Sequence, residues 1–207
     1  MVKSKAQLGI ELFKLRGFSN PDVNLEQYQT DSEIVASMLW KCYMDNNMTS
    51  VADLGSGTGI IGLGAALLEP YQIILVEKDS GAIEICKQNQ AKLEERYGEL
   101  PIEYVNSDIK DFNTQVDTVI MNPPFGVQNE HADRVFLEQA MKIANNIYSL
   151  HKIESKQFIE KFAKDNNFSV KEIIEFEFSL KPTMKFHKQN VKKIKVGFWY
   201  LKRKRYN

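Results

Sequence analysis

A glycine-rich turn, VADLGSGTG at residues 51–59, constrains the fold more than any other stretch of this chain. Its first four residues are typical of a buried strand, and Gly55, Gly57 and Gly59 follow where that strand gives way to a helix. Glycines at such a turn permit positive φ and let a ligand approach the backbone, while the helix start offers N–H groups. The pattern therefore predicts a strand–turn–helix unit that binds a ligand.

Strand-like and helical segments alternate after this unit, which predicts a doubly wound α/β fold with a mostly parallel, seven-stranded, Rossmann-like sheet. The last two strands alternate apolar and polar residues, so we expect them to pair antiparallel through the connection 181–190. The expected strands cover residues 51–54, 73–77, 102–106, 117–121, 147–150, 174–180 and 194–200. The first expected helix carries Leu8, Leu12 and Leu15, and the second starts at Thr30, with Glu33 in a capping box, and runs through Cys42. Further helices are expected from about Gly59, at 80–96, at 133–146 and after residue 150.

The composition is that of a globular protein, with 43% apolar and 26% charged residues. No apolar run approaches the roughly 18 residues of a membrane span and no signal peptide is visible, so we expect a cytoplasmic protein. Cys42 and Cys86 lack the spacing of a disulfide framework or a zinc site. We expect a single domain over residues 1–207, comprising an N-terminal helical segment (1–46), a core (51–150) and C-terminal strands with a basic tail (151–207).

The formal net charge of zero hides an asymmetry along the chain. Residues 181–207 contain ten Lys and Arg and no Asp or Glu, so this segment carries +10 and the remainder −10. One interpretation is a solvated strand with a frayed tail. The other is a binding surface for a polyanion, with aromatic residues among the charges.

Carboxylates beside the turn indicate which ligand it binds. Gly57, Gly59 and Gly62 also fit a G-x-G-x-x-G pattern with Glu77 downstream, so a nicotinamide-dependent oxidoreductase is formally allowed. However, Asp53 directly before the turn would repel a pyrophosphate. It suits S-adenosylmethionine, which carries a sulfonium and an ammonium and no phosphate. Glu77 would then accept from the ribose hydroxyls and Asp108 from the adenine amine, each just beyond a strand.

The motif NPPF follows the fourth strand, in VIMNPPFG at residues 119–126. Consecutive prolines hold the chain in a fixed turn. The Asn122 amide and the Pro123 carbonyl can each accept a hydrogen bond from an amino group, and Phe125 offers a stacking surface. Holding both N–H bonds of an exocyclic amine localises its lone pair and aims it at the sulfonium methyl, so the catalysis needs positioning and electrostatics without a strong base.

These motifs together resemble a class I S-adenosylmethionine-dependent methyltransferase, and in detail the archaeal and eukaryotic small-subunit rRNA adenosine N6-methyltransferases, the family of methyltransferase-like protein five. The resemblance covers nearly the whole chain: LEQYQT (25–30), VADLGSGTGIIGLG (51–64), VIMNPPFG (119–126), VFLEQAM (135–141), YSLHK (148–152) and KFHK (185–188). NPPF alone is shared with guanine and glutamine methyltransferases, whereas LEQYxT with YSLHK and KFHK is much narrower. The expected fold is therefore a Rossmann-like methyltransferase sheet.

The resemblance also implies roles for individual residues. Gln27 and Thr30 would contact the methionine end of the cofactor, Tyr28 would help to close the site, and Thr30 also suits a helix N-cap. RNA is the implied partner, together with a small zinc-binding activator subunit docked along a sheet edge. The implied cofactor site comprises Gln27, Tyr28, Thr30, Asp53, Gly55, Gly57, Thr58, Gly59, Ile60, Glu77, Asp108, Ile109 and Asn122. The target adenine would be held by Asn122, Pro123, Pro124 and Phe125.

Other functions remain open from the residues alone. The same chemistry could act on guanine N2 in RNA, on DNA adenine or on a protein glutamine. The nicotinamide-dependent oxidoreductase and a catalytically silent RNA-binding scaffold are alternatives of other classes. His151 and His187 have no metal-ligand spacing around them, and we assign neither a catalytic role, although His187 could lie near phosphate.

Overall fold

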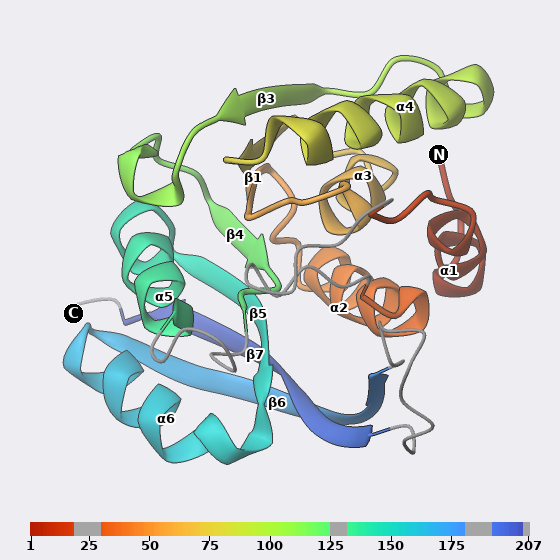
Figure 1. Ribbon diagram of the computed structural model, residues 1–207. Helices are drawn as coiled ribbons and strands as arrows, with labels where there is room; N and C mark the ends of the chain where they lie inside the picture. The colour runs from red at the N-terminus through yellow and green to blue at the C-terminus, as the bar shows by residue number, and fades with distance from the viewer. Residues whose placement is uncertain (19–29, 125–131, 181–191, 205–207) are drawn as a thin grey trace.

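A computed structural model describes residues 1–18, 30–124, 132–180 and 192–204 (Figure 1). The described part contains a seven-stranded sheet in the order β3-β2-β1-β4-β5-β7-β6. The strands are β1 (Ser50–Leu54), β2 (Gln72–Glu77), β3 (Ile102–Asn106), β4 (Thr118–Met121), β5 (Asn146–Lys152), β6 (Phe168–Leu180) and β7 (Lys192–Arg203). The predicted doubly wound, mostly parallel fold is confirmed.

Among the described strands, β7 alone runs opposite to the direction of the others. The pairs β1–β2, β2–β3, β1–β4 and β4–β5 are parallel, whereas β7 lies antiparallel between β5 and β6. The expected antiparallel pairing of the last two strands is therefore confirmed, and β7 also pairs with β5. The parallel arrangement brings the carboxyl ends of β1, β2, β3, β4 and β5 to one edge of the sheet, where ligands bind in such folds.

Helices cover both faces of the sheet (Figure 1). Side chains of the first four helices pack into the hydrophobic cluster on one face, and those of the last two pack into the cluster on the other. The helices are α1 (Lys5–Phe13), α2 (Ser32–Met44), α3 (Ile60–Ala66), α4 (Ser80–Tyr97), α5 (Ala132–Ile143) and α6 (Lys156–Asp165), with 3-10 turns η2 (Ile109–Asp111) and η3 (Ile153–Ser155).

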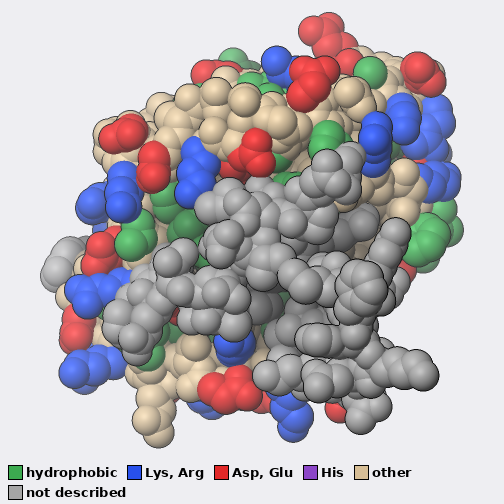
Figure 2. Space-filling view, viewed as in Figure 1, with side chains coloured by type: hydrophobic (Ala, Val, Ile, Leu, Met, Phe, Trp, Pro, Cys, Tyr) green, Lys and Arg blue, Asp and Glu red, His purple; other side chains and the backbone are tan. Residues whose placement is uncertain are grey.

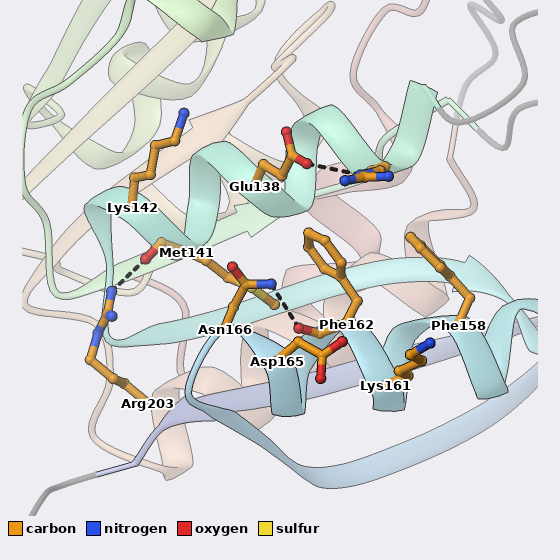
Figure 3. Close-up of a pocket in the computed structure, with 10 residues that line it drawn as sticks. Glu138, Met141, Lys142, Phe158, Lys161, Phe162, Asp165, Asn166 and Arg203 are labelled. Carbon is orange, nitrogen blue, oxygen red and sulfur yellow. Dashed lines mark hydrogen bonds and ion pairs between the residues drawn. The ribbon is translucent and has the colours of Figure 1, made fainter.

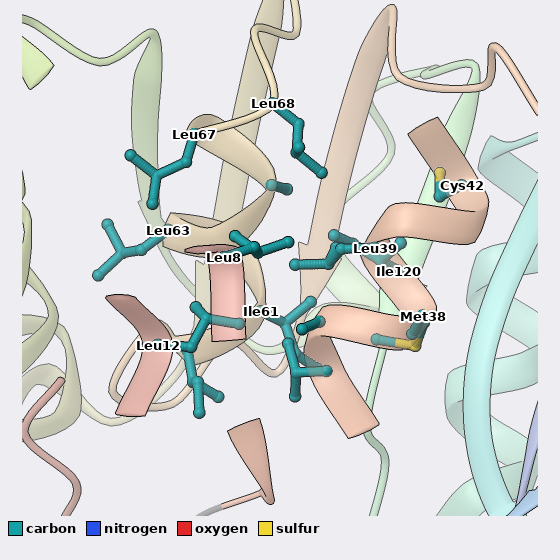
Figure 4. Close-up of a cluster of buried hydrophobic side chains, with 14 of the residues drawn as sticks. Leu8, Leu12, Met38, Leu39, Cys42, Ile61, Leu63, Leu67, Leu68 and Ile120 are labelled. Atoms are coloured by element: carbon teal, nitrogen blue, oxygen red, sulfur yellow. The ribbon is translucent and has the colours of Figure 1, made fainter. Parts of the chain in front are cut away.

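The alternation of side chains along the strands divides the core in two. In β1, Val51 faces the cluster beneath α1–α4, while Ala52 and Leu54 face the cluster beneath α5 and α6. Figure 4 shows the first cluster, in which Leu8 of α1 and Leu39 of α2 approach the side chains of α3. Burial on both faces explains why these strands read as continuous apolar runs.

Three helix boundaries differ from the prediction. Asp31, not Thr30, is the N-cap of α2: its carboxylate accepts from the N–H groups of Glu33 (2.9 Å) and Ile34 (3.2 Å). Both residue types are good caps, so the sequence alone could not choose between neighbours. α5 ends at Ile143 rather than at 146, because Asn146 already begins β5. Leu15 lies beyond the end of α1 but is still buried.

Candidate active site

Three residues of the predicted site stand in one row at the carboxyl edge of the sheet. Leu54 of β1 is paired with Val76 of β2 and with Met121 of β4. Gly55, Glu77 and Asn122 directly follow these three paired residues. The register therefore brings together the glycine turn, the second-strand carboxylate and the first residue of the NPPF motif, as the sequence predicts.

The glycine turn has the backbone conformation that only glycine adopts easily. Gly55, Gly57 and Gly59 have φ values of 71°, 54° and 89°. The N–H groups of Gly55 and Ser56 both donate to the Val76 carbonyl, at 2.9 and 3.1 Å. These bonds fasten the turn to β2, and α3 begins immediately after Gly59.

Asp53 lies beneath the turn and is 1% exposed. Its Oδ2 accepts a hydrogen bond of 2.8 Å from the Gly62 N–H, whereas its Oδ1 is buried with no hydrogen-bond partner among the described residues. Burial raises the pKa of Asp53 to about 8, the Gly62 bond opposes that rise, and the nearby Glu77 carboxylate adds to it. A buried carboxylate with an unsatisfied oxygen would be stabilised by a cationic ligand.

Glu77, at the end of β2, is 9% exposed. Its Oε2 accepts from the Gly57 N–H at 2.8 Å, and its Oε1 accepts from the Asp79 N–H at 2.9 Å. The carboxylate thus ties the glycine turn to the start of α4. Each carboxylate oxygen has a further lone pair with which it can accept from a hydroxyl group.

The Asn122 side chain is hydrogen-bonded to Thr30, which directly precedes Asp31, the N-cap of α2. Its Nδ2 donates a hydrogen bond of 2.8 Å to the Oγ1 of Thr30, which is 6% exposed. In this arrangement the amide nitrogen Nδ2 faces Thr30. The carbonyl oxygen Oδ1, the acceptor that the predicted chemistry requires, then occupies the other position of the amide plane. Pro123 beyond it is buried.

The remaining described site residues lie around this row. Asp108 follows β3 and accepts from the Lys110 N–H at 3.0 Å, so it caps the short turn η2 in which Ile109 is buried. Thr58 and Ile60 flank Gly59 and are buried. Gln27, Tyr28 and Phe125 lie outside the described residues, as does His187.

Asn89, which no sequence motif marks, clamps the N-terminal segment to the glycine turn. This buried α4 side chain accepts from the Arg16 N–H (2.9 Å) and donates to the carbonyls of Arg16 (2.9 Å) and Thr58 (3.1 Å). The clamp brings Phe18 against the turn, since a Cβ built on Gly57 would lie 2.9 Å from the Phe18 ring. Residues 16–18 and the glycine turn are far apart in sequence but therefore lie in contact.

Phe136 of α5 also approaches the turn. A Cβ built on Gly55 would meet the Phe136 ring at 2.9 Å. Glycine at this position is therefore required both by its positive φ and by the aromatic ring beside it. An apolar position on an amphipathic helix carries no sequence signal that distinguishes a ring at the site from a ring in the core.

His151, near the end of β5, is buried beside two polar side chains. Its Nε2 lies 2.8 Å from the Ser149 hydroxyl, and its Nδ1 lies 3.9 Å from the Asp133 carboxylate at the start of α5. Burial lowers the pKa of His151 to about 3. The ring is therefore neutral near pH 7 and lies between β5 and the start of α5.

The described residues hold no group of three or more His, Cys, Asp or Glu that could bind a metal ion. Cys42 and Cys86 are buried free thiols. No helix in the described part is long and apolar enough to cross a membrane. On the face shown in Figure 2, Lys and Arg side chains are interspersed with Asp and Glu. Residues 181–191 and 205–207, which carry part of the predicted basic surface, lie outside the described residues.

Comparison with known proteins identifies the family. The family model described as the methyltransferase small domain matches residues 29–152, which include the glycine turn, Glu77 and the NPPF motif. This chain belongs to the methyltransferase small domain family. Family membership argues against the nicotinamide-dependent oxidoreductase that the 57–62 glycines formally allow.

Relatives within this family agree with the resemblance predicted from the motifs. The chain is 35% identical to the zebrafish (Danio rerio) rRNA N(6)-adenosine-methyltransferase METTL5, over 90% of this chain and 93% of the relative. A crystal structure from Pyrococcus horikoshii, described as an RNA methyltransferase, is 37% identical and has a TM-score of 0.87, covering 98% of this chain and 99% of that one. The resemblance to rRNA adenosine N6-methyltransferases is therefore confirmed.

The fold is also shared with a more distant methyltransferase. Magnesium protoporphyrin IX methyltransferase from Synechocystis, solved with S-adenosylmethionine bound, has a TM-score of 0.64 at 15% identity and covers 99% of each chain. This likeness shows the Rossmann-like methyltransferase fold, as predicted.

Proposed function

We propose that this protein is a cytoplasmic enzyme that transfers the methyl group of S-adenosylmethionine to N6 of an adenosine in small-subunit rRNA. The observation that carries the proposal is the Asn122 amide at the end of β4, oriented by Thr30 and level with the glycine turn. The similarity to rRNA N6-adenosine-methyltransferases over nine-tenths of the chain supports adenosine in rRNA as the substrate.

The residues around the turn fit S-adenosylmethionine. Asp53 has a buried oxygen without a hydrogen-bond partner among the described residues, and Glu77 presents a carboxylate at the end of β2. A cofactor with an ammonium, a sulfonium and ribose hydroxyls matches these acceptors, because a nearby cation favours the ionised form of Asp53 and the hydroxyls can donate to Glu77. We propose that Asp53 and the turn face the methionine end, that Glu77 holds the ribose, and that Asp108 with Ile109 borders the adenine.

The bound cofactor supplies an electrophilic methyl group on a sulfonium. The protein supplies the geometry of the acceptor. The Oδ1 of Asn122 and the carbonyl of Pro123 would accept hydrogen bonds from the two N–H groups of the target amine, which localises the lone pair on N6 and points it along the line of transfer. The N–CH3 bond would form as the S–CH3 bond breaks, S-adenosylhomocysteine would leave, and the surplus amine proton would pass to solvent. We propose that Pro124 stiffens this turn and that Phe125 stacks on the base. The neutral His151 takes no part in proton transfer.

RNA binding outside the base pocket would come in part from the basic segment 181–207. Within its described portion, however, the Arg203 guanidinium already donates to the carbonyls of Met141 and Ala144. We therefore propose Lys202 and Lys204, rather than Arg203, as phosphate contacts from this segment. We also propose a small zinc-binding activator along a sheet edge, and β3 and β6 are the two outer strands of the described sheet.

The proposal is tested by incubating the purified protein with labelled S-adenosylmethionine and ribosomal RNA, with and without a candidate activator, and analysing the nucleosides. We expect label in N6-methyladenosine, and none with Asn122→Ala. Label in N2-methylguanosine, or label only when DNA or a protein replaces the RNA in the reaction, would instead identify one of the related substrates. Tight S-adenosylhomocysteine binding without transfer to any substrate would identify a silent scaffold.

A further inference from the structure

A groove of about 730 Å³ lies between α5 and α6, on the opposite face of the sheet from α1–α4 (Figure 3). No role in the active site has been assigned to its lining. The lining is charged and aromatic, which distinguishes it from the apolar interior of a helix–helix contact. It includes the cationic side chains of Arg134, Lys142, Lys161 and Arg203 and the rings of Phe158 and Phe162.

Three of the four cations are exposed and can reach an anion. Arg134 pairs with Glu138 at 2.9 Å, and exposed pairs of this kind are weak. Neither Lys142 nor Lys161 has a carboxylate within 4.0 Å among the described residues. Asp165 and Glu138 are the carboxylates of the lining, so the cations outnumber them. The groove is therefore suited to a negatively charged occupant.

The aromatic rings form a stacking surface. Phe158 is 36% exposed, and its ring stacks with Phe162 at a centroid distance of 5.5 Å. Both rings rise from α6 toward α5 in Figure 3. The Arg134 guanidinium lies 5.6 Å from the centre of the Phe162 ring. Exposed aromatic rings and arginine planes are the surfaces on which unpaired nucleic-acid bases stack.

The groove begins beside the candidate active site. Asp133 at the start of α5 lies 3.9 Å from His151, and Ser149, two residues earlier in β5, is paired with Met121 of β4. Asn122 directly follows Met121 at the carboxyl edge of the sheet. Arg134 directly follows Asp133, which lies beside His151 near the same edge, so the Arg134 end of the groove is close to the candidate active site. From Arg134 to Lys142, α5 spans about 12 Å. An RNA strand leaving the target pocket can therefore enter the groove at its Arg134 end.

We infer that the α5–α6 groove binds the single-stranded RNA that flanks the target adenosine. Arg134, Lys142 and Lys161 contact its phosphates, and Phe158 stacks on an unpaired base. This inference rests on the proposed function, because it takes the substrate RNA as the occupant. It adds an RNA-contacting surface on α5 and α6 to the basic segment 181–207, which borders the groove at Arg203.

The test measures RNA affinity and its salt dependence for Arg134→Glu, Lys161→Glu and Phe158→Ala in the full chain. The probe is protein-free ribosomal RNA, and each affinity is measured at several salt concentrations. We expect each charge reversal to weaken binding and to reduce the slope of log affinity against log salt by about 0.7 or more for every phosphate that is no longer neutralised. Phe158→Ala should weaken binding at least about fivefold and leave the slope unchanged.

Matched controls lie on other surfaces. Lys92→Glu reverses an exposed charge on α4, and Phe13→Ala removes a ring of α1 that is 80% exposed. Both should bind RNA as the wild type does, and all five variants should keep wild-type affinity for S-adenosylhomocysteine. Arg134→Glu also disturbs contacts within the protein, so Lys161→Glu is the decisive charge variant.

Identical affinities and slopes in Lys161→Glu and Lys92→Glu would overturn the inference. A photo-crosslinking residue at position 158 gives an independent outcome: attachment to RNA supports the groove, and attachment only to a ribosomal or activator protein overturns it. Methyl transfer by the wild-type enzyme separates the two hypotheses. If the wild type methylates rRNA while the groove variants behave like the controls, this inference fails and the proposed function stands.

Discussion

The side-chain amide of Asn122 donates a hydrogen bond of 2.8 Å to the hydroxyl of Thr30, across 92 residues of sequence. The bond joins the end of β4 to the residue before the Asp31 cap of α2. In this arrangement the amide nitrogen faces Thr30 and the amide oxygen lies on the other side of the amide plane. The N-terminal segment therefore contributes to the geometry of the target pocket through a residue that the sequence predicts as a helix cap or a cofactor contact.

Replacement of Asn122 by Ala should lower kcat for methyl transfer by about a hundredfold or more, because the variant lacks an acceptor for the target amine. Affinity for S-adenosylhomocysteine should change little. Labelled methyl transfer and binding titrations measure the two quantities. Loss of cofactor affinity in proportion to activity would contradict the assignment of Asn122 to the target base.

Replacement of Thr30 by Val should lower kcat and leave the fold intact, because Val keeps the volume but cannot accept from the Asn122 amide. A net hydrogen bond contributes about 0.5–1.5 kcal/mol, so we expect a fall of about two- to tenfold. Thr30→Ser keeps the hydroxyl and serves as the control that restores activity. Equal activity in the Ser and Val variants would rule out a positioning role for this hydroxyl.

Replacement of Glu77 by Ala should weaken S-adenosylmethionine binding at least about tenfold, since charge-assisted hydrogen bonds contribute about 1.5–3 kcal/mol. The thermal midpoint should also fall, because Glu77 holds the N–H groups of Gly57 and Asp79. Glu84→Ala, at an exposed position of α4, is the matched control. Unchanged cofactor affinity would mean that Glu77 serves the turn alone.

The buried carboxyl of Asp53 should make stability depend on pH. Its pKa is raised by burial from 3.8 to about 8. Between these values the folded state holds a proton that the unfolded state has released, so the free energy of unfolding should fall as pH rises from about 4 to 8. Asp53→Asn should lose this component, and denaturant titrations across the window measure the difference. A wild-type curve parallel to that of Asp53→Asn would show that the carboxyl titrates normally.

Replacement of Arg203 by Met should reduce the free energy of unfolding by about 1–3 kcal/mol, because its guanidinium satisfies carbonyls at the end of α5 and lies 4.6 Å from the centre of the Phe168 ring. Lys204→Met, at an exposed position, is the control. Denaturant unfolding of both variants measures the effect. Equal stability would return Arg203 to the group of RNA-binding candidates.

The order of strands and helices was predictable because hydrophobic periodicity and turn residues are local signals. The row of Gly55, Glu77 and Asn122 was predictable too, because parallel strands place their carboxyl ends together. The Thr30 cap was wrong, because Asp31 beside it caps equally well and Thr30 binds Asn122 instead. Partners far apart in sequence were not predictable: Asn89 and Arg16 are 73 residues apart. No local pattern encodes such a pair.

The position of β7 bears on how the protein is made. β7 is the last strand along the chain, yet it lies between β5 and β6 and pairs with both. During synthesis, the β5 edge of the emerging sheet therefore stays unpaired until β7 has left the ribosome, and β6 has no neighbour to join. The half of the sheet that carries the candidate active site can therefore form first, with the β5 edge exposed to other chains. Completion of the sheet therefore waits for β7, and chaperones that shield strand edges would act on the chain before that strand pairs.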